Sequence, residues 1–221
     1  AEMDYLKYQI NPHFFMNTLN NIHSLIDIDA AYAQDAVIEL SKMMRYVLYE
    51  SGHEAITLEK DIQFMENYIK LMRIRYTEDV DIRFDYTNDL PHDVTIPPLL
   101  LIVFVENAFK HGICPKEEGG VVRIRINPLR DKGLLYISVC DNGVGIQPEQ
   151  LAQLKAALAQ PGERWEHIGV YNVAARLRLL NKRGRLVIRS HPGRGTAISM
   201  YLPLVELLEE DLDDDTPVDR G

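Results

Sequence analysis

The sequence has few cysteines and lacks any long apolar run. Only two of its 221 residues are cysteines, Cys114 and Cys140. They are too far apart in the sequence for a metal knuckle and suit a reducing, cytoplasmic compartment. No segment approaches the roughly eighteen consecutive apolar residues that a membrane-spanning helix needs, and no secretory signal opens the sequence. With a hydrophobic content of 46%, the composition predicts a soluble globular protein.

An excess of basic residues is missing as well. The net charge is -9, and residues 201–221 alone contribute -7 through eight acids and one base. The rest of the chain therefore carries only -2. A terminal acidic run without aromatic side chains is typical of a solvated, disordered tail, to which we assign residues 206–221. This charge balance predicts that nucleic acid is not a ligand.

The first quarter of the chain has helical spacing of apolar residues. Residues 1–27 and 31–51 predict two helices joined by a turn at 27–30. Two helices of this length cannot bury their apolar stripes against each other alone. We expect either dimerisation into a four-helix bundle or packing on the downstream domain. The expected domains are residues 1–54 for these helices and 55–205 for a larger domain.

The pattern in residues 55–205 favours an α+β two-layer sandwich. Thr57 suits the N-cap of a third helix that reaches Tyr76. The further expected elements are a strand at 80–86, a helix from 96 to 109, strands at 121–127 and 134–140, a mobile stretch, a helix at 169–182, and strands at 186–190 and 196–202 that turn at 192–195. Strands in hairpins with helices between them indicate the α+β class.

A histidine follows a proline in the segment 9–20, QINPHFFMNTLN. Pro12 cannot donate a backbone hydrogen bond, so the helix is either kinked there or begins there with Asn11 as its cap. In both cases His13 lies at a backbone irregularity. Asn17 is four residues later, on the same helix face. A lone histidine near an apolar face is usually structural, so this segment needs support from elsewhere in the sequence.

Four separated segments of the larger domain carry polar or glycine residues that packing alone does not require. They read VENAFKHG at 105–112, DNGVG at 141–145, HIGVYN at 167–172 and GRGT at 193–196. In the first segment, Glu106, Asn107 and Lys110 fall on neighbouring turns of one helix. A carboxylate, an amide oxygen and a cation can then converge on Mg²⁺ and phosphates, although a solvated helix face would look similar.

Glycines dominate the other three segments. Next to Asp141, Gly143 and Gly145 would let the backbone approach a flat ring closely. Gly169 would open a helix whose free backbone amides can hold phosphate. Taken singly, each segment is equally typical of a turn or a hairpin.

The order of these segments is more specific than any one of them. An asparagine box, D-x-G-x-G, a glycine-opened helix and G-x-G-T resemble the ATP-binding (GHKL, or Bergerat) fold that gyrase-type ATPases, Hsp90-type chaperones, histidine kinases and MutL-type repair proteins share. The segment around His13 resembles the phosphoacceptor box of LytS/YehU-type sensor histidine kinases. Together the two resemblances cover residues 1 to about 204.

The resemblance implies a two-component sensor histidine kinase that autophosphorylates His13 from ATP. It implies that Asn107 binds Mg²⁺ and that Asp141 reads the adenine amino group. The other implied nucleotide contacts are Lys110, His111, Gly143, Gly145, Gly169, Asn172 and Thr196. Glu106 is a further catalytic candidate. Asn17 is a candidate for holding a water during dephosphorylation of the regulator, with a structural role in the bundle as the alternative.

The resemblance also implies partners and a location. It implies a homodimer that passes phosphate to an aspartate of a response regulator, for example of the LytTR type. We expect this portion to be cytoplasmic and the full-length protein to reach the bacterial inner membrane through upstream segments. Two alternatives stay open, a catalytically silent ATP-binding dimerisation module and a GHKL-type ATPase in which Glu106 activates water.

Overall fold

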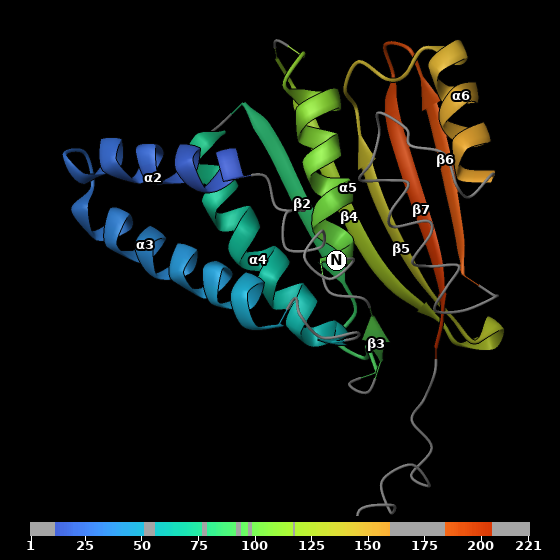
Figure 1. Ribbon diagram of the computed structural model, residues 1–221, viewed down its shortest axis with the longest axis horizontal. Coiled ribbons are helices and arrows are strands. Elements are labelled where there is room, and N and C mark those ends of the chain that lie inside the picture. The colour runs from blue at the N-terminus through green and yellow to red at the C-terminus, as the bar shows by residue number, and fades with distance from the viewer. Residues whose placement is uncertain are drawn as a thin grey trace, which may run out of the picture.

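The computed structural model describes residues 12–50, 56–76, 79–91, 94–96, 99–116, 118–159 and 184–204. These residues form a group of helices and a mixed five-stranded sheet (Figure 1). The predicted α+β class is confirmed. None of the helices in the described ranges combines the length and the apolar character that crossing a membrane would require.

The N-terminal part is a hairpin of two helices, α2 (Pro12–Ile26) and α3 (Ala30–Arg45), which lies to one side of the sheet in Figure 1. Asp29 caps α3, because its carboxylate accepts a hydrogen bond of 2.9 Å from the backbone N–H of Tyr32. After Arg45 the chain continues as a π-helical turn, η1 (Tyr46–Glu50). The sequence predicted the helix pair but not this change of pitch, and residues 1–11 lie outside the described residues.

A third helix, α4 (Leu58–Arg75), packs against the hairpin. It begins where the sequence predicted, because Thr57 is its N-cap. The ring of Phe14 lies 4.9 Å from that of Tyr68, and the ring of Tyr46 lies 4.4 Å from that of Phe64. Within one chain, the hairpin therefore packs on the downstream helix, which is one of the two expected arrangements.

The sheet has the strand order β2-β4-β5-β7-β6. Its strands are β2 (Val80–Tyr86), β4 (Gly120–Leu129), β5 (Leu134–Asp141), β6 (Arg185–His191) and β7 (Gly195–Pro203), each within two residues of the predicted bounds. β2 pairs in parallel with β4, and the other pairs are antiparallel. Alternate residues of β4 and β5 are buried, namely Val122, Ile124, Ile126, Leu135, Ile137 and Val139. Because side chains alternate along a strand, the core lies on one face of the sheet.

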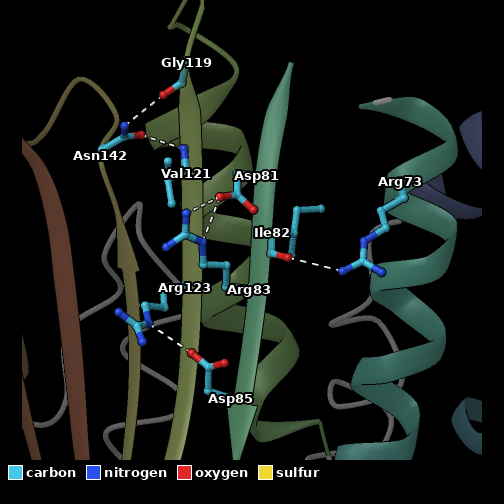
Figure 2. Close-up of polar contacts among 9 residues, drawn as sticks. All are labelled: Arg73, Asp81, Ile82, Arg83, Asp85, Gly119, Val121, Arg123 and Asn142. Carbon is cyan, nitrogen blue, oxygen red and sulfur yellow. Dashed lines mark hydrogen bonds and ion pairs between the residues drawn. The ribbon is translucent and has the colours of Figure 1, made fainter. Parts of the chain in front are cut away.

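The core helix is α5 (Leu100–Asn107), whose residues from Leu100 to Val105 are all buried. It continues as a second π-helical stretch, η2 (Ala108–Ile113). Arg73 of α4 donates to the carbonyl oxygen of Ile82 in β2 at 3.3 Å, which ties the helical layer to the sheet edge (Figure 2).

Two predictions about helices differ from the structure. The helix predicted from residue 96 begins four residues later, because residue 96 belongs to a short strand pair of β1 (Ile56–Thr57) and β3 (Thr95–Ile96). The stretch after β5, where the sequence analysis expected no helix, contains α6 (Pro148–Ala159). Three leucines of α6, at 151, 154 and 158, pack on the core. The helix predicted at 169–182 and the acidic tail lie outside the described residues.

Candidate functional site

A cavity of about 550 Å³ lies between α5 with η2, the loop after β5, α6 and the strands β6 and β7. It is lined by Phe104, Asn107, Ala108, Lys110, His111, Gly112, Val139, Asp141, Val144, Gly145, Ile146, Gln150, Leu154, Ile188, Thr196 and Ile198. Six of the predicted contacts meet here, namely Asn107, Lys110, His111, Asp141, Gly145 and Thr196. The volume suits a small-molecule ligand.

Asp141, at the end of β5, is the central carboxyl group of this cavity. Its Oδ1 accepts a hydrogen bond of 2.9 Å from the backbone N–H of Gly143. Burial raises the pKa of Asp141, and hydrogen bonds from the backbone N–H groups of Gly143 and Thr196 oppose that rise. The carboxyl group is therefore fixed in orientation and able to accept a further hydrogen bond from a ligand.

Glycines let η2 and the loop after β5 approach each other closely beside Asp141. A Cβ atom on Gly112 would lie 2.5 Å from Oδ1 of Asp141, and one on Gly143 would lie 2.1 Å from the carbonyl oxygen of Gly112. That oxygen accepts a hydrogen bond of 3.2 Å from the backbone N–H of Val144. Gly143 does not line the cavity, and this close approach explains why position 143 excludes a side chain.

The loop after β5 is also fastened to the turn between β6 and β7. Gly145 has φ +73°, and a Cβ atom there would lie 2.1 Å from the carbonyl oxygen of His191. The backbone N–H of Gly193 donates to the carbonyl oxygen of Val144 at 2.8 Å. The two predicted glycine motifs, D-N-G-V-G and G-R-G-T, are therefore neighbours in space.

Ser190 is a buried polar residue that the sequence analysis missed. Its Oγ accepts from the backbone N–H of Ile146 at 2.8 Å and lies 2.8 Å from Oγ1 of Thr196. It also donates to the carbonyl oxygen of Gly195 at 3.0 Å. This hydroxyl group joins the loop after β5 to β7 and orients Thr196. A serine on the core-facing side of a strand was the available signal.

Asn142, the second residue of the D-N-G-V-G motif, has a structural role. Its Oδ1 accepts from the backbone N–H of Val121 at 2.7 Å, and its Nδ2 donates to the carbonyl oxygen of Gly119 at 2.9 Å (Figure 2). The Lys116 ammonium group donates to the Asn142 carbonyl oxygen at 3.0 Å. These bonds tie the end of β5 to the start of β4.

The helical wall of the cavity carries Asn107, Lys110 and His111. Asn107 ends α5, while Lys110 and His111 lie on η2 and are exposed. The part of the chain that the structure describes holds no cluster of three His, Cys, Asp or Glu residues that could bind a metal ion alone. An amide oxygen such as that of Asn107 suits Mg²⁺, which takes few protein ligands and keeps water and phosphate oxygens.

Glu106 lies toward the helical layer and is not among the residues that line the cavity. Burial raises its pKa to about 7, and the charge of Lys110 opposes that rise. Burial and then the charge of Glu106 raise the pKa of Tyr68 in α4. Glu106 is thus a half-buried carboxyl group between α5 and α4.

The remaining predicted residues are outside the cavity or outside the described part. His13 is the second residue of α2, and its side chain is not among those described. Asn17 is exposed on α2 and does not line the cavity. Gly169 and Asn172 lie outside the described residues.

The sequence analysis also missed the apolar wall of the cavity. Val139, Ile188 and Ile198 are buried side chains from three neighbouring strands. They lie at the core-facing positions of the alternating pattern, which could have identified them. Gln150 and Leu154 come from α6, the helix that was not predicted.

The chain matches two protein families. Residues 1–80 match "Histidine kinase", and residues 93–206 match "Histidine kinase-, DNA gyrase B-, and HSP90-like ATPase". The sensor histidine kinase YpdA of Escherichia coli is 33% identical over 203 residues, which are 92% of this chain and 34% of YpdA. The sensor protein LytS of Bacillus subtilis is 30% identical over 210 residues, 95% of this chain and 35% of LytS.

The chain therefore spans about a third of the length of these curated relatives. A solved histidine kinase domain, that of the blue-light activated kinase from Erythrobacter litoralis EL346, matches with a TM-score of 0.49 and 18% identity. That match covers 91% of this chain and 93% of the other. With residues 93–206 matched over more than half of its length, the chain belongs to the histidine kinase-, DNA gyrase B- and HSP90-like ATPase family; its residues 1–80 match the histidine kinase family, and it is similar to LytS sensor proteins over most of its own length.

Proposed function

We propose that this protein transfers the γ-phosphoryl group of ATP to His13 and then to an aspartate of a response regulator. The observation that carries the proposal is the cavity in which Asp141, Thr196 and Asn107 converge, in a chain whose first helix holds the histidine of a phosphoacceptor-like segment. The match of residues 1–80 to histidine kinases supports the same assignment.

Asp141 is the proposed contact of the adenine base. Its carboxyl group is held by two backbone N–H groups, so it can accept a hydrogen bond from an amino group without reorienting. Val139, Ile188 and Ile198 supply apolar surface for the ring beside it. Thr196, held by Ser190, lies on the same wall.

The helical wall is the proposed phosphate side. Lys110 supplies a positive charge, and His111 lies next to it. Asn107 would hold Mg²⁺ through its amide oxygen. When bound, Mg²⁺ neutralises phosphate charge and orients the reacting group. By resemblance, Gly169 and Asn172 complete the phosphate contacts.

The proposed reaction at His13 is an in-line displacement. A nitrogen of the neutral imidazole attacks the γ-phosphorus, the N–P bond forms, and the bond to the bridging oxygen of ADP breaks. The imidazole proton is released to solvent, and ADP leaves. Positioning and charge stabilisation provide most of the catalysis in such transfers. Asn17, one turn after His13, is the proposed site for holding a water when the regulator is dephosphorylated.

A homodimer is the proposed assembly, and the hairpin supports it. Its exposed large apolar side chains include Met16, Leu19 and Ile26 on α2 and Val37 and Met44 on α3, and Leu48 on η1 continues the α3 set. Within each helix these residues recur at helical spacing, so each set forms a stripe. A second copy of the chain would cover both stripes. A response regulator, for example of the LytTR type, is the proposed recipient of the phosphate.

One observation favours an ATPase as the second candidate. The pKa of Glu106, about 7, would suit a group that takes a proton from water. Against it, Glu106 is not among the residues that line the cavity. A silent ATP-binding module would bind nucleotide but would neither form phosphohistidine nor release phosphate.

Incubation with Mg²⁺ and γ-labelled ATP separates the three candidates. For the kinase we expect a label on the protein that is stable in base and labile in acid, as a phosphoramidate is. His13→Gln should abolish this label and leave ATP affinity unchanged. Free phosphate that depends on Glu106, without labelled protein, would support the ATPase. ATP binding without either product would support the silent module.

A further inference from the structure

A buried carboxyl group joins the helical hairpin to the helix of the nucleotide cavity. Asp61 of α4 has only 1% of its surface exposed. Its Oδ1 accepts a hydrogen bond of 2.8 Å from the hydroxyl group of Tyr46. Tyr46 is the first residue of η1, directly after α3, and its ring packs on Phe64. Through this hydroxyl group, the end of the hairpin is bonded to α4.

The same carboxyl group holds the start of α5. It accepts hydrogen bonds from the backbone N–H groups of Leu101 and Leu99. These groups belong to the first turn of a helix, where N–H groups have no partner within the helix and an acid is favourable. Leu99 has φ +62°, a left-handed conformation that costs a residue with a Cβ atom about 1–2 kcal/mol. The surroundings must therefore fix Leu99 in place.

Packing alone does not explain an acid at position 61. Burial raises the pKa of Asp61 to about 6, against the hydrogen bonds from Tyr46, Leu101 and Leu99. Its other oxygen, Oδ2, is buried and has no hydrogen-bond partner among the described residues. A half-satisfied buried carboxyl group is unfavourable, and an apolar side chain would avoid that cost. The acid at position 61 therefore needs an explanation other than stability.

We propose that Asp61 is a positioning residue that couples the nucleotide cavity to the phosphoacceptor hairpin. The first turn of α5 is hydrogen-bonded to Asp61. The last residue of α5, Asn107, lines the cavity. A shift of α5 on nucleotide binding moves the acceptor of the Tyr46 hydroxyl group, and with it the end of α3. The significance of this coupling for phosphorylation of His13 rests on the proposed function, whereas the coupling itself requires only nucleotide binding.

Three substitutions dissect the junction. Tyr46→Phe removes the hydroxyl group and keeps the ring on Phe64. Asp61→Ala removes every acceptor, whereas Asp61→Asn keeps one acceptor oxygen and removes the charge. A matched control is Tyr86→Phe, because the Tyr86 hydroxyl group donates to Oε1 of Glu66 in α4 at 2.6 Å on the exposed surface. That bond also joins a tyrosine to an α4 carboxylate, but it is not attached to the hairpin or to α5.

Backbone hydrogen exchange measures the coupling in the intact chain, with and without a non-hydrolysable ATP analogue and Mg²⁺. We expect the analogue to slow exchange in residues 43–50 in the parent, in Tyr86→Phe and in Asp61→Asn. This response should disappear in Tyr46→Phe and Asp61→Ala. Affinity for the analogue should stay within about twofold in Tyr46→Phe, while its phosphorylation rate falls about tenfold.

Several outcomes would overturn the inference. It fails if residues 43–50 of the parent do not respond to the analogue, or if Tyr46→Phe responds as the parent does. It also fails if Tyr46→Phe loses affinity and rate by the same factor, because that pattern indicates general structural damage. If the parent shows the response but His13 is never labelled, the proposed function is wrong and the coupling stands.

Discussion

At the nucleotide cavity the loops are fixed by backbone contacts, whereas at the α2–α3 hairpin large apolar side chains are left exposed. Around the cavity, Gly145 lies so close to the carbonyl oxygen of His191 that no side chain fits, and Ser190 bonds three segments together. In the turn of the hairpin Ile28 is 82% exposed, and on η1, directly after α3, Leu48 is 65% exposed. The described residues that line the cavity are held by contacts within the chain, whereas the apolar side chains of the hairpin are exposed and form the surface of the proposed dimer.

This difference predicts that nucleotide binding and phosphoryl transfer depend on different parts of the molecule. The described lining of the cavity comes from one chain, so we expect nucleotide affinity to survive dissociation of the proposed dimer into monomers. The hairpin that carries His13 depends on what covers its apolar stripes, so we expect phosphoryl transfer to depend on assembly. Asp61 lies at the junction of the two regions, which makes its substitution the sharpest way to separate them.

The largest expected effect is the pH dependence of the junction. The pKa of Asp61 is raised from 3.8 to about 6, so the folded protein holds an extra proton between these values. The contribution of this group to the free energy of unfolding is therefore full below pH 3.8 and is lost as the pH rises through 6. The loss should approach 3 kcal/mol, at about 1.4 kcal/mol per pKa unit.

Urea unfolding of the parent and of Asp61→Asn at a series of pH values measures this contribution. The difference in stability between the two proteins should change across this range and then stay constant above pH 7. Because other titrating groups, including Glu106, are present in both proteins, their contributions to the pH dependence cancel in the difference. A difference that does not vary with pH would mean that Asp61 titrates normally.

The next largest effect is expected from removing Asp141, the proposed contact of the adenine base. Asp141→Ala removes a charge-assisted hydrogen bond and should weaken ATP binding by about 1.5–3 kcal/mol. Asn107→Ala should chiefly weaken the dependence of binding on Mg²⁺. Calorimetric titration with ATP, with and without Mg²⁺, distinguishes the two variants. Unchanged ATP affinity in Asp141→Ala would contradict the placement of the base.

Gly145→Ala tests the close backbone approach at the cavity. Gly145 and Gly193 have nearly equal φ values, +73° and +75°, so an alanine at either position carries similar backbone strain. Only at Gly145 does the new Cβ atom meet another atom, at 2.1 Å. Urea unfolding should show Gly145→Ala less stable than Gly193→Ala by about 1–3 kcal/mol. Equal losses would indicate that strain alone matters there.

Val37→Glu tests the hairpin surface. A charge in the apolar stripe of α3 should raise the dissociation constant of the proposed dimer at least about tenfold, or about 1.4 kcal/mol. Gln34→Glu is the control, because Gln34 is exposed on the same helix and the added charge is the same. Sedimentation over a range of concentrations gives the constants. Nucleotide affinity should not change in either variant.

The smallest expected change is that of Asn17→Ala. This side chain is exposed, so its loss should leave the melting temperature within about 1 °C, as is usual for surface positions. We expect autophosphorylation to persist and dephosphorylation of the cognate regulator to slow. Parallel loss of both activities would indicate the structural role instead.

Local signals predicted much of the fold. Thr57 predicted its helix start, and the alternation in residues 80–86 predicted β2. The missed α6 had a readable signal, because Leu151, Leu154 and Leu158 follow helical spacing. The short strand at Ile96 had no such signal, because two residues are too few to show an alternating pattern. The prolines that follow it suggested the start of a helix instead.

The candidate site could also be predicted in part, where its residues belong to recognisable sequence motifs. The order of the four motifs predicted that Asp141 and Asn107 would share a site, and both line the cavity. Ser190 and Asp61 could not be predicted, because their roles depend on which segments the fold brings together. The π-helical turns η1 and η2 also had no sequence signal, since a change of pitch arises from packing.

The central claim is that nucleotide bound at the Asp141 cavity phosphorylates His13. The most direct measurement is the site and chemistry of the label after incubation with Mg²⁺ and γ-labelled ATP. The account predicts one acid-labile, base-stable phosphate at His13, lost in His13→Gln and reduced in Asp141→Ala. Equal labelling of His13→Gln would contradict it.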